Sequence, residues 1–191
     1  GACMGCGEKT VIHLVVAAVN ALMVPRVDAQ VKRLDELMQG LDTKARSLLS
    51  SAADLEGLVE GNGSSLGVTV DSDRTAELPP LVDAIRELKD LHWRYTEGPS
   101  GRGRANMGFT NSTGCTSVWG SSYPYNPYPF PWVNHLFQDA PSVAVGIFEG
   151  HIHKMADGFI AVSRAQKLLE AKYDEARDEK FFQTFDWEQF D

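Results

Sequence analysis

The sequence has more acidic than basic residues and no cluster of basic ones. It contains 18 Lys and Arg against 26 Asp and Glu, which gives a formal net charge of −8. Its densest basic spot is the short segment Arg102-Gly-Arg104. Because nucleic-acid binding depends on basic surfaces that neutralise phosphates, this composition argues against a nucleic-acid partner.

An uninterrupted hydrophobic run of membrane-spanning length is also absent. The best apolar stretch, residues 11–24, is broken by His13 and Asn20, whereas a spanning helix needs roughly 20 mostly apolar residues. The first residues lack the charged and then apolar segments of a secretory signal. These absences predict a cytoplasmic protein with no membrane partner. Residue 1 is not methionine, which suggests processing or a start inside a longer parent chain.

Cysteine is scarce, because only Cys3, Cys6 and Cys115 are present. An odd count fits poorly with a secreted disulfide scaffold, so reduced thiols or metal ligands are the better interpretation. The two-residue spacing in Cys3-Met-Gly-Cys6-Gly7 lets both thiolates reach one metal. On spacing alone, the pair could belong to an iron–sulfur site, half a zinc ribbon or a redox dithiol. It could also be two small buried thiols.

Other candidate ligands are weaker. Cys115 follows a glycine within a run of small hydroxyl and amide side chains, whose N–H and O–H groups could donate to a thiolate, a cluster sulfide or a phosphate. His13 or His92 could bind zinc, although a histidine on a helical face is more often a core or surface residue. His151 and His153 point in different directions on a helix, so we expect both to be solvated.

Hydrophobic spacing predicts helices in the first half of the chain. Apolar residues surround nearly the whole of segment 9–23, which predicts a helix buried on most sides. Pro25 is expected to end or kink that helix. A heptad-like seam then continues from residue 24 to 59, followed by a glycine-rich break over 57–67. Leu78-Pro-Pro-Leu81 opens a further helix. We therefore predict an antiparallel helical hairpin over residues 24–95.

The second half contains more irregular segments. We expect a loop over residues 97–105, a short strand over 106–110 and a long helix from Pro141 to about Arg177. The stretch Tyr123 to Trp132 contains four prolines, which exclude a helix and a central strand. It is either an ordered loop walled by aromatic rings or a disordered one. The tail, residues 181–191, is rich in aromatic residues that a free terminus would leave exposed.

Three segments, taken in order, point to one family. They are Gly1-Ala-Cys-Met-Gly-Cys-Gly-Glu8, then Asn111-Ser-Thr-Gly-Cys-Thr-Ser-Val-Trp-Gly120, and then Asn126-Pro-Tyr128 followed by Pro131-Trp-Val-Asn-His-Leu-Phe-Gln-Asp139. They resemble the Cys-x-Gly-Cys-Gly-Glu, Asn-Ala-Thr-Gly-Cys-Ser-Ser, Asn-Pro-Tyr and Ala-Trp-Ala-Asn-Ser-Leu-Phe-Glu-Asp segments of the pyruvate:ferredoxin (2-oxoacid:acceptor) oxidoreductases. Three motifs in the family's order are more specific than any one of them.

The resemblance implies a cofactor site. It makes Cys3, Cys6 and Cys115 ligands of a [4Fe–4S] cluster whose fourth ligand lies elsewhere, and it places Glu8 and Cys115 against thiamine diphosphate. Thr113, Thr116 and Ser117 would tune the cluster. The family's Gly-Asp-Gly and Asn-containing segments, which hold Mg²⁺ and the diphosphate, have no match in this chain. No catalytic residue is assigned to the chain itself.

The resemblance also implies an architecture and an activity. The fold would be part of an α/β thiamine diphosphate-binding domain that is predominantly α-helical in this fragment. Residues 1–23 would begin that domain, 24–96 would form a helical hairpin insertion, and 97–191 would continue it in truncated form. The parent enzyme, a homodimer, would oxidise a 2-oxoacid such as pyruvate to acyl-CoA with coenzyme A, and pass electrons to ferredoxin or flavodoxin. The alternatives are a non-catalytic zinc-binding module and a helical interaction module.

Overall fold

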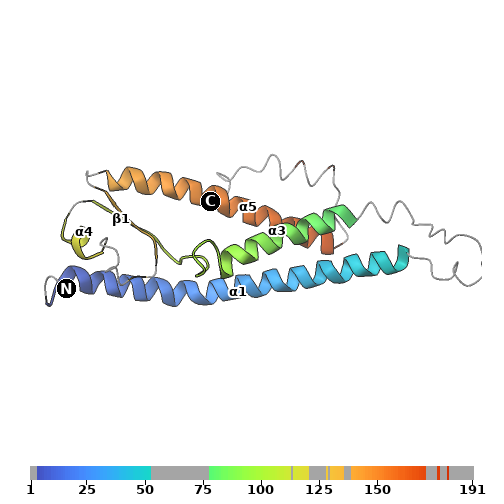
Figure 1. Cartoon of the computed structure of the whole chain (residues 1–191), viewed down its shortest axis with the longest axis horizontal. Coiled ribbons are helices and arrows are strands. Elements are labelled where there is room, and N and C mark those ends of the chain that lie inside the picture. Colours follow the sequence, from blue (N-terminus) through green and yellow to red (C-terminus); the bar gives the residue numbers. More distant parts are fainter. Residues whose placement is uncertain are drawn as a thin grey trace, which may run out of the picture. The chain divides into compact units, whose positions relative to one another are not determined.

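The computed structural model describes residues 4–52, 78–112, 114–120, 128, 130–135 and 139–170, together with residues 176 and 180. Along the chain, the elements are α1 (Gly7–Ala52), α3 (Leu78–Thr96), β1 (Phe109–Ser112), α4 (Cys115–Gly120), β2 (Trp132–His135) and α5 (Ala140–Leu169), as labelled in part in Figure 1. They pack as two units. The first comprises Gly1–Val31 and Trp93–Met155, and the second comprises Lys32–His92 and Ala156–Asp191.

Helix α1 begins just after the first cysteine motif and does not end at Pro25. The Cys6 carbonyl accepts from the Thr10 backbone N–H and hydroxyl, both at 3.2 Å, which closes the first turn. Pro25 lies inside the helix, so of the two outcomes expected there, an end or a kink, the structure excludes the end. A proline removes one backbone hydrogen bond, but the strong helix formers around it, such as Leu22 and Met23, favour continuation on both sides.

The loop predicted over residues 97–105 is confirmed, and glycines shape it. Helix α3 ends where Gly98, at φ 59°, donates its N–H to the Trp93 carbonyl at 2.8 Å, an arrangement that glycine favours at a helix end. Gly103, at φ 71°, donates to the Glu97 carbonyl at 2.7 Å. A Cβ on Gly103 would clash with the Tyr95 carbonyl. The turn thus brings the chain back beside the end of α3 before β1.

The first unit contains a two-stranded parallel sheet. Phe109 pairs with Trp132 and Ser112 pairs with His135 at the two ends of the register. Strand β1 lies about where a strand was expected over 106–110, but it begins three residues later. Asn106, before the strand, instead donates its side-chain N–H to Asn20 of α1 at 3.1 Å. The four prolines were expected to exclude a central strand up to Trp132, yet β2 begins at that residue.

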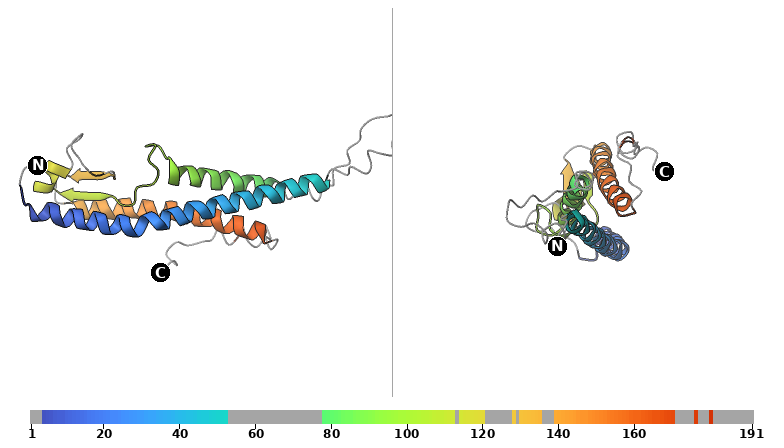
Figure 2. Two further views of the ribbon diagram at one scale, coloured as in Figure 1. Left: turned by 90° about the horizontal axis from the view of Figure 1, so that it is seen from below. Right: turned by 90° about the vertical axis from the view of Figure 1, so that its right-hand side faces the viewer.

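In the second unit, three helical segments share an apolar core, and Figure 2 shows them side by side. Polar side chains also join the helices: Nε2 of His92 lies 3.3 Å from an Asp35 carboxylate oxygen, and Arg164 donates to the Glu87 carboxylate at 2.6 Å. The predicted hairpin helices therefore pack against a third one, α5. The core consists of Leu34, Leu37 and Leu41 from α1, Leu81, Ala84 and Leu88 from α3, and Ala161, Val162, Ala165 and Leu168 from α5.

Two broader expectations stay predictions. A mostly helical chain with a two-stranded parallel sheet is compatible with part of an α/β fold without establishing one. Among the residues that the structure describes, one helical stretch, Gly7–Ser50, contains an 18-residue window of mean hydropathy 1.7, which is long and apolar enough to cross a membrane. Only 6% of that window is buried within the structure, so the expectation of a buried helix over residues 9–23 is wrong: Leu14 and Leu22, for example, are exposed. The cytoplasmic localisation and the domain boundaries stay predictions.

Candidate functional site

The structure describes two of the three cysteines, and both are free thiols. Cys6 is half-buried just before α1, and Cys115 is exposed as the first residue of α4. Cys3 lies outside the described residues. Glu8 is exposed in the first turn of α1. The described part of the chain brings together no group of three or more His, Cys, Asp or Glu side chains that could hold a metal, so it does not complete the donor set of a cluster.

The turn before Cys115 is fixed by the hydroxyl group of Ser117. This hydroxyl donates to the Ser112 carbonyl at 2.8 Å and accepts from the Gly114 N–H at 3.1 Å. In return, the Ser117 N–H donates to the Gly114 carbonyl at 3.1 Å. Ser117 thus holds the turn that precedes Cys115. The expectation that Thr116 and Ser117 donate to a cluster stays a prediction. Thr113, another expected donor, lies outside the described residues.

Asn111 connects this turn to both strands. Its amide N–H group donates to the Ser117 hydroxyl at 2.9 Å and to the Asn134 side-chain oxygen at 3.1 Å. Its own side-chain oxygen accepts from the indole N–H of Trp132. One amide therefore links β1, β2 and the start of α4. The position of Cys115 depends on this network, because Cys115 lies between Gly114 and Ser117.

Stacked aromatic rings lie beside the two strands. The rings of Phe109 and Trp132 are 4.9 Å apart at 14°, and Phe130 stacks on Phe109 at 5.2 Å. Tyr128 stacks on Phe130 and places its hydroxyl 3.5 Å from Nδ1 of His13 on α1. Burial raises the pKa of Tyr128 above its usual value of 10.0. The described residues 128 and 130–132 therefore contribute stacked rings, with Trp132 in strand β2. Residues 121–127 and 129 lie outside the described part, so the choice between an ordered and a disordered loop for this stretch stays open.

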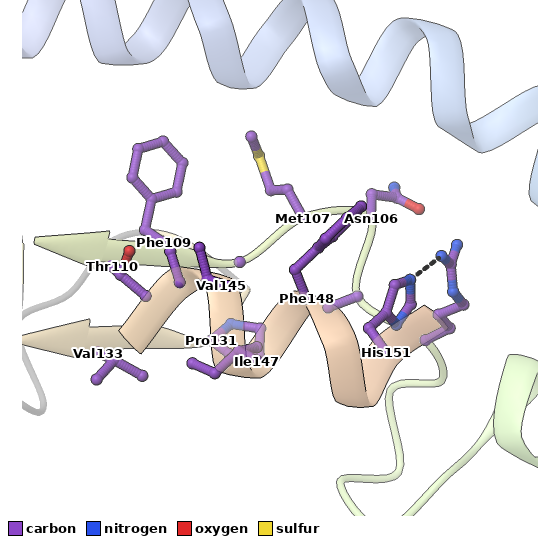
Figure 3. Close-up of a pocket in the computed structure, with 14 residues that line it drawn as sticks. Asn106, Met107, Phe109, Thr110, Pro131, Val133, Val145, Ile147, Phe148 and His151 are labelled. Atoms are coloured by element: carbon purple, nitrogen blue, oxygen red, sulfur yellow. Dashed lines mark hydrogen bonds between the residues drawn. The ribbon is translucent and has the colours of Figure 1, made fainter. Parts of the chain in front are cut away.

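The first unit also contains an open pocket of about 740 Å³. Its walls are the segment from Arg104 to Thr110, the chain at Pro131 and Val133, and the first half of α5. Figure 3 shows this pocket from the side, with His151 at one end. The Arg104 guanidinium lies 3.3 Å from Nε2 of His151. Sequence reasoning missed this pairing because the two residues are 47 positions apart.

The expectation that His151 and His153 are solvated is confirmed, because both residues are exposed. His151 also lies close enough to Arg104 for the guanidinium to affect it. Partial burial, and next the positive charge of Arg104, lower its pKa below the usual 6.5. The lowered pKa favours the neutral imidazole, whose Nε2 can accept a hydrogen bond from the guanidinium. In the sequence, the Arg104–His151 contact was signalled only by the basic segment that contains Arg104. That segment did not indicate His151 as the partner.

Comparison with known proteins gives one distant relation. No protein-family model matches the chain, and no solved structure matches it. A stretch of 52 residues is 38% identical to part of the pyruvate dehydrogenase (NADP+) of Cryptosporidium parvum, and the match covers 24% of this chain. The chain matches 3% of the length of that relative. Part of the chain is thus distantly related to a pyruvate oxidoreductase.

Proposed function

We propose that the chain is part of a 2-oxoacid oxidoreductase that converts pyruvate, or a close analogue, to acyl-CoA and passes the electrons to an iron–sulfur cluster. The single observation that carries the proposal is the 38% identity to a pyruvate dehydrogenase (NADP+) over 52 residues. The motifs around Cys3, Cys6 and Cys115 point to the same family. An enzyme of this kind is proposed to act as a cytoplasmic homodimer.

The proposed cofactors are a [4Fe–4S] cluster and thiamine diphosphate with Mg²⁺. Thiolates are the usual ligands of such clusters, and we assign Cys3, Cys6 and Cys115 to this role. Glu8 and Cys115 are the proposed contacts to thiamine diphosphate, whereas the Mg²⁺ ligands would come from elsewhere in the enzyme. The described residues do not complete the donor set, so the proposal concerns ligand identity and does not extend to the steps of electron transfer.

Local geometry supports Cys115 as a ligand position. Its turn is held by the hydroxyl of Ser117 and the amide of Asn111, and its thiol is exposed. An exposed thiol on a fixed turn can bind a cluster without reorganisation of the backbone. For the domain organisation, we propose that residues 1–23 and 97–191 carry the cofactor region of an α/β domain. Residues 24–96 are proposed to form an insertion with a structural role.

The test is anaerobic reconstitution of the full chain with iron and sulfide in the presence of a small thiol, which can occupy the fourth ligand position. We expect bound iron and labile sulfide in equal amounts. Serine variants of Cys3, Cys6 and Cys115 should each lose most of that iron. The matched control is Met4→Ser, because Met4 is 101% exposed and lies between the first two cysteines.

The outcomes separate the competing functions. If the chain binds zinc without iron or sulfide, the cluster assignment is wrong and the chain is a zinc-binding module. If the serine variants bind as much iron as Met4→Ser, the cysteines have no metal role, and the three-helix packing of the second unit would favour an interaction module instead. Ferredoxin and flavodoxin, the proposed electron acceptors, are then to be compared as oxidants of the reconstituted parent enzyme.

A further inference from the structure

The pocket in the first unit has the size of a small-molecule site. Its volume is about 740 Å³, and sites for small ligands and cofactors typically span about 300 to 1,000 Å³. No cysteine lines it. The ligand of this pocket therefore does not depend on the proposed cluster.

Most of the pocket wall is apolar, and much of this apolar surface is uncovered. Val145 is 65% exposed and Phe148 is 62% exposed, although both line the pocket. In Figure 3, both side chains project from α5 towards the segment that carries Met107. Apolar side chains around an open hollow gain free energy when an apolar ligand displaces water from them. The wall therefore requires an apolar body in its ligand.

One end of the pocket carries a positive charge. Arg104 is half-buried, and its described contacts are Nε2 of His151 at 3.3 Å and the Tyr95 ring at 5.7 Å. Neither contact supplies a carboxylate, because one partner is an imidazole and the other is an aromatic ring face. Over the described ranges, the structure gives Arg104 no carboxylate partner. A guanidinium has five N–H donors in a planar fork, and this fork matches a carboxylate.

We propose that this pocket binds an amphipathic carboxylate, a molecule with one carboxylate group and an alkyl or aryl body. The carboxylate pairs with Arg104, and the body lies against Val145 and Phe148. A neutral apolar ligand would leave the guanidinium without a counter-charge, and an ammonium ligand would be repelled by it. A small carboxylate without an apolar body would leave the α5 side exposed to water.

The experiment is a calorimetric titration of the full chain with sodium octanoate. Acetate, octanol and octylamine are the comparison ligands, because each lacks one feature or reverses the charge. We expect octanoate to bind about tenfold or more tightly than octanol, as hydrogen bonds to charged groups would give. Acetate and octylamine should show no saturable binding. Equal binding of octanol or octylamine would overturn the proposal.

Two variants locate the binding. Arg104→Met should reduce octanoate affinity to that of octanol, whereas Arg102→Met, on the same loop but outside the pocket, should leave it unchanged. Val145→Glu places a negative charge at an exposed position of the wall and should abolish binding. Its control is Met155→Glu, which is also exposed on α5 and does not line the pocket. If a control variant weakens octanoate as much as its pocket counterpart, octanoate binds elsewhere and the proposal is wrong.

Discussion

Replacement of Leu41 by alanine tests whether the three-helix core of the second unit holds the chain together. Leu41 of α1 is 0% exposed and belongs to the same core as Leu88 of α3 and Ala165 of α5. The substitution removes three carbon atoms, so the lost transfer free energy is about 2.4 kcal/mol at roughly 0.8 kcal/mol per buried CH₂. The cavity left behind adds to this cost, because measured Leu→Ala changes in cores span about 2 to 5 kcal/mol.

We therefore expect Leu41→Ala to lower the free energy of unfolding by about 3 kcal/mol. With a urea dependence of about 2 kcal/mol per molar, the unfolding midpoint would fall by about 1.5 M. The assay is urea unfolding followed by far-UV circular dichroism. Leu49→Ala is the matched control, because Leu49 lies on the same helix and is 54% exposed; its change should stay within about 0.5 kcal/mol. Equal shifts for the two variants would refute the packing of this core.

Three further predictions concern the first unit. Gly103→Ala should destabilise it more than Gly101→Ala, because both glycines have positive φ but only Gly103 meets the Tyr95 carbonyl; thermal unfolding of both variants decides this. Asn111→Ala should remove the link between the strands and the Cys115 turn, so that the thiol reacts at a changed rate with a neutral alkylating reagent, and an unchanged rate would contradict the network. The pKa of His151 is lower in the folded chain than the usual 6.5, so between these two values the unfolded chain binds more protons. The free energy of unfolding therefore falls as the pH drops through this window. His151→Gln should lose less of that free energy than the unmodified chain when the pH is lowered from 7 to 5.

Hydrophobic spacing predicted the helices well because burial itself repeats with the helical period. Leu34, Leu41, Leu81 and Leu88 were on the predicted seams, and all four are fully buried in the structure. The same periodicity could not reveal that the second half of α5 completes the core. An apolar seam indicates that a helix packs against another element, but it does not identify that element.

The errors come from tertiary context. Pro25 has a strong local preference to end a helix, but its neighbours keep the helix continuous. Strand β1 includes Asn111 and Ser112, whose polar side chains lower strand propensity; pairing with β2 and the Asn111 hydrogen bonds compensate for this. Sequence motifs could identify the cysteines, because their spacing is local. They could not identify the contact between Arg104 and His151, which depends on how the loop and α5 pack.

The most direct test of the account is the metal content of the full chain after anaerobic reconstitution, measured for the unmodified chain and for Cys115→Ser. The account predicts iron and labile sulfide in equal amounts in the unmodified chain and a loss of most of both in the variant. Equal iron in the two proteins, or zinc in place of iron and sulfide, would contradict the assignment of Cys115 to a [4Fe–4S] cluster.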